Sequence, residues 1–262
     1  MKNALRALLL ALILTLTLAA CGTPAETPTP AISVEPPTNT PEPLPTVASS
    51  NPCANENFPV APNTRWLYSS TGSPIGPYEF AERISDAGAT GFTVASQLRK
   101  TPSFVTWECR PEGLAPVGMP PNNATNILAF QRLTDVVITN SVGVVIPTTI
   151  APGMEWTFSF DLTANQILQD GTVATVTGHI EIKYKAKGRE SVTVQAGTFD
   201  CIPVEVVSQI STITAKPAGE DKLNLSSNYT YWYAAGIGWV KASGSGAVGG
   251  QDYFETIELT NR

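Results

Sequence analysis

The sequence has little of the chemistry on which most enzymes depend. It contains a single histidine, His179, which shares the polar side of a predicted strand with Thr177, Glu181 and Lys183. A Ser-His-Asp or Cys-His catalytic arrangement would have to use this residue, and the sequence has no G-x-S-x-G nucleophile elbow. One imidazole without a C-x-x-C pair does not favour a zinc site. We therefore predict a protein that is not an enzyme, with no catalytic residues, no metal site and no cofactor.

Positive charge and phosphate-binding loops are also scarce. The chain has 16 lysines and arginines against 22 aspartates and glutamates, which gives a net charge of −6 at pH 7. It has no Walker loop, no calcium-loop spacing and no G-x-G-x-x-G motif that opens a helix. An acidic chain with so few basic residues lacks the surface that nucleic acid or anionic lipid headgroups require. We expect no nucleic-acid partner.

The first 20 residues have the pattern of a lipoprotein signal peptide. Lys2 and Arg6 make a positive start, and residues 8–20 form an apolar run that is too short to span a bilayer comfortably. The run ends in Leu-Ala-Ala-Cys-Gly, which resembles a lipobox, in which Cys21 would receive the lipid and become the new N-terminus. An ordinary signal peptide cleaved at Ala-x-Ala is the alternative, but it has no need of the cysteine. We expect a protein that is anchored to the cell membrane by acyl chains, such as palmitate, on its extracytoplasmic face.

Residues 21–52 are predicted to be the lipidated cysteine and a disordered linker. Proline, threonine, glutamate and serine dominate this stretch, and it lacks the large apolar side chains needed to offset the entropy of ordering. Such a linker would span roughly 30 Å as a coil and about 95 Å when extended. The folded domain, residues 53–262, would therefore stand away from the membrane.

The folded domain shows apolar and polar residues in alternation many times. Trp156, Phe158 and Phe160 alternate with polar neighbours, and helical periodicity is almost absent, since only Thr163–Asp170 allows one short helix. One-sided alternation is typical of antiparallel sheet with one wet face. Strands that recur every 10–15 residues or so, with turn signals between them, indicate a sandwich or barrel. We predict an all-β domain whose curved antiparallel sheet forms a half-open barrel, with at most one short helix.

A faint internal repeat divides this domain. Residues 61–69 align with residues 151–159, and four of the five tryptophans fall in matched order. One hypothesis is that two related half-units, residues 55–150 and 151–262, share a single core. Coincidence among common strand and turn sequences is the alternative.

Two segments in the last third of the chain have the most specific pattern. Residues 192–200 read V-x-V-x-A-G-T-F-D, which predicts a hairpin with its turn at residues 196–198. Residues 231–241 read Y-W-Y-A-x-G-x-G-x-V-K and are interpreted as a strand, and residues 243–246, Ser-Gly-Ser-Gly, are interpreted as a flexible turn. The first two segments together resemble a family of uncharacterised bacterial envelope lipoproteins, which is similar in turn to the half-barrel superfamily of LolA, LolB and LppX. This resemblance implies a half-barrel in the cell envelope and, by analogy with members that carry lipids or lipoproteins, an apolar ligand.

With Cys21 assigned to the lipid, three cysteines remain. An exported protein can form disulfides, so three single pairings or three free thiols are open. Cys53 and Cys109 are the favoured pair because both flank loop-like segments, where a disulfide can tie the N-terminal tail to the sheet. Cys201 lies inside a predicted strand and is interpreted as a small buried residue.

Aromatic residues are the remaining candidates for a binding site. Trp156 and Phe158 share one strand face, and Tyr231 and Tyr233 share another. Such residues usually pack in a core, but a curved sheet of this size can also hold an apolar ligand in its interior. We predict non-catalytic binding or transfer of a hydrophobic ligand, such as a lipid, in a cavity lined partly by these four residues. A structural or protein-interaction module displayed on a stalk, with an unknown protein partner, and an envelope hydrolase are the alternatives.

Overall fold

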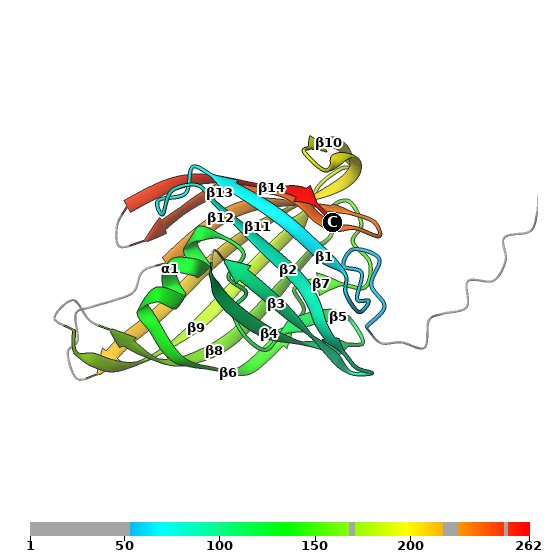
Figure 1. The fold of residues 1–262 in the computed structure, drawn as a ribbon. Helices are drawn as coiled ribbons and strands as arrows, with labels where there is room; N and C mark the ends of the chain where they lie inside the picture. The colour runs from blue at the N-terminus through cyan, green and yellow to red at the C-terminus, as the bar shows by residue number, and fades with distance from the viewer. Residues whose placement is uncertain (1–52, 99, 168–170, 217–224, 249–250) are drawn as a thin grey trace, which may run out of the picture. The chain divides into compact units, whose positions relative to one another are not determined.

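The computed structural model describes residues 53–262, apart from residues 99, 168–170, 217–224 and 249–250 (Figure 1). The signal peptide, Cys21 and the linker lie outside the described residues. The described part of the chain forms a single antiparallel sheet of 14 strands with one α-helix, α1 (Ala124–Arg132). The strands are β1 (Arg65–Thr71), β2 (Tyr78–Ala87), β3 (Gly91–Leu98), β4 (Thr101–Arg110), β5 (Gly113–Pro116), β6 (Leu133–Gly143), β7 (Ile146–Pro147), β8 (Glu155–Ile167), β9 (Val173–Ala186), β10 (Glu190–Val194), β11 (Gly197–Lys216), β12 (Leu225–Ala234), β13 (Gly238–Val248) and β14 (Gln251–Asn261).

The sheet is strongly curved but does not close. Its strands follow the order β6-β8-β9-β11-β12-β13-β14-β1-β2-β3-β4-β5-β7, and β10 pairs only with β11 (Figure 1). β6 and β7 are therefore the two free edges of the sheet, although only Val144 and Val145 separate them in the chain. This architecture confirms the predicted fold class, an all-β half-open barrel with one short helix. Residues 55–150 and 151–262 contribute to the same sheet, and their relation as repeated half-units stays a prediction.

The helix lies elsewhere than the sequence pattern predicts. β8 continues to Ile167, and Leu162, Ala164 and Gln166 are buried at every second position, which is the period of a strand. The helix starts instead after Asn123, whose side-chain oxygen accepts a hydrogen bond of 2.9 Å from the backbone N–H of Asn126. α1 contacts β6, β12 and β13. In the described part of the chain no helix has the length and apolar character needed to cross a membrane.

The two segments behind the family resemblance are both hairpins. Val194 pairs with Gly197, so the turn between β10 and β11 consists of residues 195 and 196, slightly earlier than predicted. The stretch interpreted as one strand is also a hairpin, because β12 ends at Ala234 and β13 begins at Gly238. Gly236 takes the left-handed conformation with a φ of 72°, which a glycine adopts without steric cost. The indole N–H of Trp66 donates to the carbonyl oxygen of Ile237 at 2.6 Å and fixes this turn against β1.

The predicted flexible turn at residues 243–246 is wrong, because these residues lie inside β13. Gly244 pairs with Tyr229 on one side and with Glu255 on the other. A Cβ atom at Gly244 would lie 2.2 Å from the carbonyl oxygen of Asn228 and 2.5 Å from the Cα of Tyr229. Glycine is therefore needed at this position because the neighbouring strand packs closely against it, and not because the chain reverses there.

The N-terminal segment of the described chain packs at one end of the curved sheet. A disulfide joins Cys53 to Cys109 of β4, with 4.9 Å between their Cα atoms. Phe58 then packs its ring against Trp66 and Trp107, at centroid distances of 5.1 and 5.7 Å. The third cysteine, Cys201, is buried with a free thiol. Figure 1 shows the N-terminal segment at one end of the sheet and α1 toward the other end.

Candidate ligand-binding cavity

The interior of the curved sheet is not completely filled. A cavity of about 120 Å³ remains among the inward side chains of most strands of the sheet. Much of its wall is apolar and comes from residues far apart in the sequence, among them Val94, Val105, Phe158, Phe160 and Ile180. An apolar cavity of roughly 150 Å³ is known to bind a molecule of the size of benzene. This space can therefore hold one small apolar group.

Three of the four residues predicted to line a cavity do so. Phe158, Tyr231 and Tyr233 lie on the wall, whereas Trp156 does not. Trp156 is the second residue of β8 and is only half-buried, so it lies beyond the cavity near the start of the strand. Its ring stacks on that of Tyr184 with 5.1 Å between centroids, and its indole N–H donates to a backbone carbonyl.

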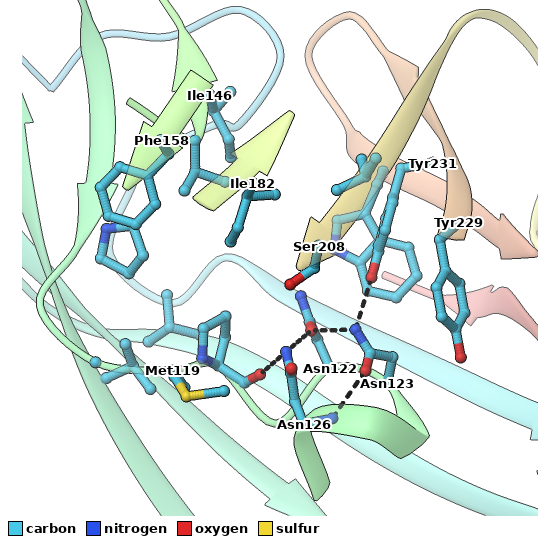
Figure 2. A pocket seen from close by; sticks show the side chains of 18 of the residues that line it. Met119, Asn122, Asn123, Asn126, Ile146, Phe158, Ile182, Ser208, Tyr229 and Tyr231 are labelled. Carbon is cyan, nitrogen blue, oxygen red and sulfur yellow. Dashed lines mark hydrogen bonds between the residues drawn. The ribbon is translucent and has the colours of Figure 1, made fainter. Parts of the chain in front are cut away.

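The partly exposed residues of the cavity wall include both apolar and polar side chains. Figure 2 shows Met119, Asn122, Asn126 and Ser208 of β11 on the wall of the cavity, and all four are partly exposed. Asn126 donates from Nδ2 to the carbonyl oxygen of Pro120 at 2.9 Å and to Oδ1 of Asn122 at 3.2 Å. These bonds hold the chain before α1 in place at the wall of the cavity.

The hydroxyl of Tyr231 has its partner in the same segment of chain before α1. It accepts a hydrogen bond of 3.1 Å from Nδ2 of Asn123, the residue that caps α1 (Figure 2). The ring of Tyr231 can therefore face the apolar space while its hydroxyl is satisfied. The start of α1 thereby positions one wall of the cavity.

A second buried group fixes α1 to the sheet. Glu255 is fully buried, and its two carboxylate oxygens accept four hydrogen bonds. Oε1 accepts from Ser70 at 2.6 Å and Tyr78 at 2.7 Å, and Oε2 accepts from the backbone N–H of Ala124 at 2.9 Å and from Tyr229 at 2.8 Å. Burial, together with the nearby carboxylate, raises the pKa of Tyr78 and Tyr229, so both hydroxyls remain donors. A buried carboxylate is tolerated here because donors surround it.

Glu82 is a second buried carboxyl group, and its surroundings differ from those of Glu255. It lies on the inner face of β2, is 4% exposed and lines the cavity. No described residue donates a hydrogen bond to its carboxyl group or forms an ion pair with it. Its neighbour on β3 is Ser96, which is also buried and also lines the cavity. Burial raises the pKa of Glu82 to about 7.

Other polar groups on the wall also lack partners. The indole N–H of Trp107 is buried and has no acceptor among the described residues. The hydroxyls of Tyr184 and Tyr233 make no hydrogen bond within the described part of the chain, and burial raises the pKa of both groups. Buried polar groups normally have partners, so a wall with several free ones is suited to a ligand that supplies them.

Glu82 was not among the site residues predicted from the sequence, although a signal for it was present. Tyr78, Phe80 and Ile84 occupy alternate positions of β2 and point inward, and Glu82 falls in the same phase. A carboxylate in the apolar phase of a strand is uncommon, because charged residues are rarely buried without a partner. The alternation within residues 78–84 therefore marks Glu82 as an unusual residue.

The remaining candidates lie away from the cavity. His179 is exposed and its Nδ1 lies 2.8 Å from a carboxylate oxygen of Asp161, in agreement with its predicted place on a polar face. Among the described residues no group of three or more histidine, cysteine, aspartate or glutamate side chains could hold a metal ion. The unpartnered polar groups of the cavity wall are therefore the main candidate site.

Comparison with known proteins gives a family match for the central part of the chain. Residues 123–245 match the family model described as DUF3108-like. These residues include α1, strands β6 to β12 and most of β13. Apart from β7, which forms the opposite edge, and β10, which pairs only with β11, these strands are neighbours in the sheet. No curated protein is significantly similar in sequence to the chain.

Two solved structures are similar in fold. A protein of Bacteroides fragilis, described as exported and as having a YmcC-like fold, is 13% identical over 78% of this chain and 97% of its own, with a TM-score of 0.45. A protein of Parabacteroides distasonis, described as a lipoprotein, is 15% identical over 79% of this chain and 98% of its own, also with a TM-score of 0.45.

Proposed function

We propose that this protein is a lipid-anchored protein of the cell envelope that binds or transfers a small hydrophobic ligand without catalysing a reaction. The observation behind the binding function is the cavity of about 120 Å³ inside the sheet. Protein interiors are packed as densely as organic crystals, and voids larger than a water molecule are few. A cavity whose wall is largely apolar is suited to a ligand with an apolar body.

The incompletely filled interior also helps to distinguish ligand binding from the alternative function, a module that only displays its outer surface. A protein that serves only to present its outer surface gains stability from a completely filled interior, since an empty cavity costs free energy. Here Val94, Val105 and Phe158 face open space. Binding is therefore the better-supported function of the two.

The envelope location is proposed from the N-terminal sequence. Cys21 follows a short apolar run and two alanines, as in a lipobox, and the linker after it would hold the domain away from the membrane. The pattern of residues 192–200 and 231–241 predicts a resemblance to the half-barrel superfamily of LolA, LolB and LppX, and such a resemblance would agree with a ligand drawn from the envelope. A lipid or another small apolar molecule is the proposed partner.

A cavity-filling substitution tests the binding function. The mature chain, residues 21–262, is purified without detergent with Cys21→Ala to prevent lipidation, and is titrated calorimetrically with toluene, a neutral probe with a single ring. Val105→Phe places a ring in the cavity and should weaken probe binding about tenfold or more while leaving thermal stability nearly unchanged. Val173→Phe, at a position that is 61% exposed, is the matched control and should bind as the parent chain does. Absence of binding by the parent chain, or equal binding by Val105→Phe, would contradict the proposal.

A further inference from the structure

We propose that the ligand of the cavity has a cationic amine group, which pairs with the carboxylate of Glu82 inside the sheet. This inference rests on the proposed binding function and names the chemistry of the ligand. It starts from the contrast between two buried carboxyl groups, of which Glu255 accepts four hydrogen bonds and Glu82 accepts none from the described residues.

The protein does not itself supply a positive charge to Glu82. The described residues that line the cavity include no lysine, arginine or histidine. A buried carboxylate without a counter-charge is costly, whereas one that meets a cation with good hydrogen bonds is tolerated. A ligand with an ammonium group would provide the missing charge and N–H donors together.

The surroundings of Glu82 are suited to an organic cation. Tyr233 and Trp239 line the same cavity as Glu82. The faces of tyrosine and tryptophan rings attract cations, most strongly where water is excluded. The hydroxyl oxygens of Tyr184 and Tyr233 could accept further N–H groups, since neither is otherwise hydrogen-bonded within the described part of the chain.

The ionisation of Glu82 provides a measurable consequence of this pairing. Burial raises its pKa to about 7, and a cation close by would lower that pKa again. The titratable groups that face Glu82 are Tyr68 on β1 and Tyr233 on β12, and the other titratable groups on the wall are Tyr184, Tyr229 and Tyr231; burial raises the pKa of all five tyrosines. Glu82 is thus the wall group that loses a proton near neutral pH when an amine binds.

Benzylamine and benzyl alcohol are a suitable pair of probes. Both have a ring of a size that the cavity can hold, and they differ in the charge of the polar group. Isothermal titration of the mature Cys21→Ala chain at pH 7.5 should show benzylamine binding about tenfold more tightly than benzyl alcohol, as expected for a hydrogen-bonded charge. Glu82→Gln keeps the shape of the side chain and should abolish that preference. Glu79→Gln, an exposed carboxylate on the same strand, is the control and should preserve it.

Proton release provides a second measurement that needs no variant. At pH 6.5, titration of the parent chain in two buffers of different ionisation enthalpy should show that benzylamine binding releases a substantial fraction of a proton, whereas benzyl alcohol releases none. Equal affinity for the two probes, a preference retained by Glu82→Gln, or the absence of proton release would each overturn the assignment of an amine. Those results leave the proposed function intact as long as toluene still binds, while failure of all three compounds to bind would overturn both proposals.

Discussion

The guanidinium group of Arg110 donates a hydrogen bond of 2.7 Å to the carbonyl oxygen of Gly143, and so links the end of β4 to the end of β6. A second guanidinium nitrogen donates to Oγ of Ser141 at 2.6 Å. β6 forms one edge of the sheet and β4 lies close to the other, so this contact holds the open sheet together at one end. The curvature that encloses the cavity therefore depends partly on a side chain and not only on strand pairing.

Removal of this link should destabilise the protein modestly. Arg110→Ala loses hydrogen bonds from a charged and partly buried group, so the free energy of unfolding should fall by about 1–2 kcal/mol. Urea unfolding measures the change. Arg65→Ala, at an exposed position on β1, is the control and should shift the free energy by less than about 0.5 kcal/mol. Equal effects of the two substitutions would show that the link contributes nothing specific.

Glu255→Gln should be far more damaging than its conservative appearance suggests. The amide nitrogen of glutamine cannot accept a hydrogen bond, so either the backbone N–H of Ala124 and the hydroxyl of Tyr229, or the hydroxyls of Ser70 and Tyr78, would lose the acceptor that Glu255 provides. We expect a loss of about 2–4 kcal/mol in the free energy of unfolding, from one disrupted buried network.

The control for this network is a carboxylate on the outer face of the same strand. Glu258 pairs with Lys241 at 2.9 Å where both side chains are partly exposed, so Glu258→Gln should cost less than about 1 kcal/mol. Denaturant unfolding of both variants measures the loss in the free energy of unfolding. A loss for Glu255→Gln no greater than that for Glu258→Gln would mean that the four hydrogen bonds do not act together.

Glu82 should make stability depend on pH in the direction opposite to that of most carboxylates. Its pKa is about 7 in the folded protein and about 4.5 in the unfolded chain, so between these values only the folded state binds the proton. The free energy of unfolding should therefore fall as the pH rises from 4.5 to 7, by about 3 kcal/mol in total, and remain lowered above pH 7. Glu82→Gln lacks this titration, so it should gain about 3 kcal/mol relative to the parent chain between pH 4.5 and pH 8.

Comparison of the two chains at each pH cancels the titration of all other groups. Chemical unfolding at pH 4.5, 6 and 8 gives the difference directly, and Glu79→Gln, exposed on the same strand, should show no pH-dependent difference of that size. A constant difference between the parent chain and Glu82→Gln across this range would show that Glu82 has an ordinary pKa.

The disulfide should contribute substantially to stability. Cys53 and Cys109 are 56 residues apart, and closing a loop of that length stabilises the folded state by about 4 kcal/mol in the chain-entropy model. The double variant Cys53→Ala and Cys109→Ala should lose an amount of this order in urea unfolding. Cys201→Ala removes the buried free thiol without opening a loop, and should cost clearly less. A loss for the double variant equal to that of Cys201→Ala would indicate that the bond adds little.

Cys21 should decide where the protein is found in the cell. Replacement by alanine removes the thiol that would receive the lipid, so Cys21→Ala should leave the membrane fraction or keep its signal peptide. Cell fractionation and intact mass measure both outcomes. A variant that stays bound to the membrane at the mature mass would show that another feature anchors the protein.

Much of the architecture follows from the sequence because strand alternation is a local property. In β2 and β8 every second side chain is apolar over most of the strand, which predicts both the strand and the face that leaves water. Local patterns were less informative where the same residue type occurs in two kinds of structure, as glycine does in turns and in closely packed strands. The Ser-Gly-Ser-Gly stretch suggests a turn, but its glycines lie in β13 because Tyr229 and Tyr253 pack closely over them.

The sequence by itself determined the class of the fold, the inward face of its strands and the pattern of a lipid anchor, because these depend on neighbouring residues. Only the tertiary structure decided which inward groups meet a partner. Glu82 and Glu255 both sit in the apolar phase of a strand, yet Glu255 meets four donors from β1, β2, β12 and α1, while Glu82 meets none among the described residues. The difference depends on how distant strands curve around a common interior, and no spacing along the chain encodes that distance.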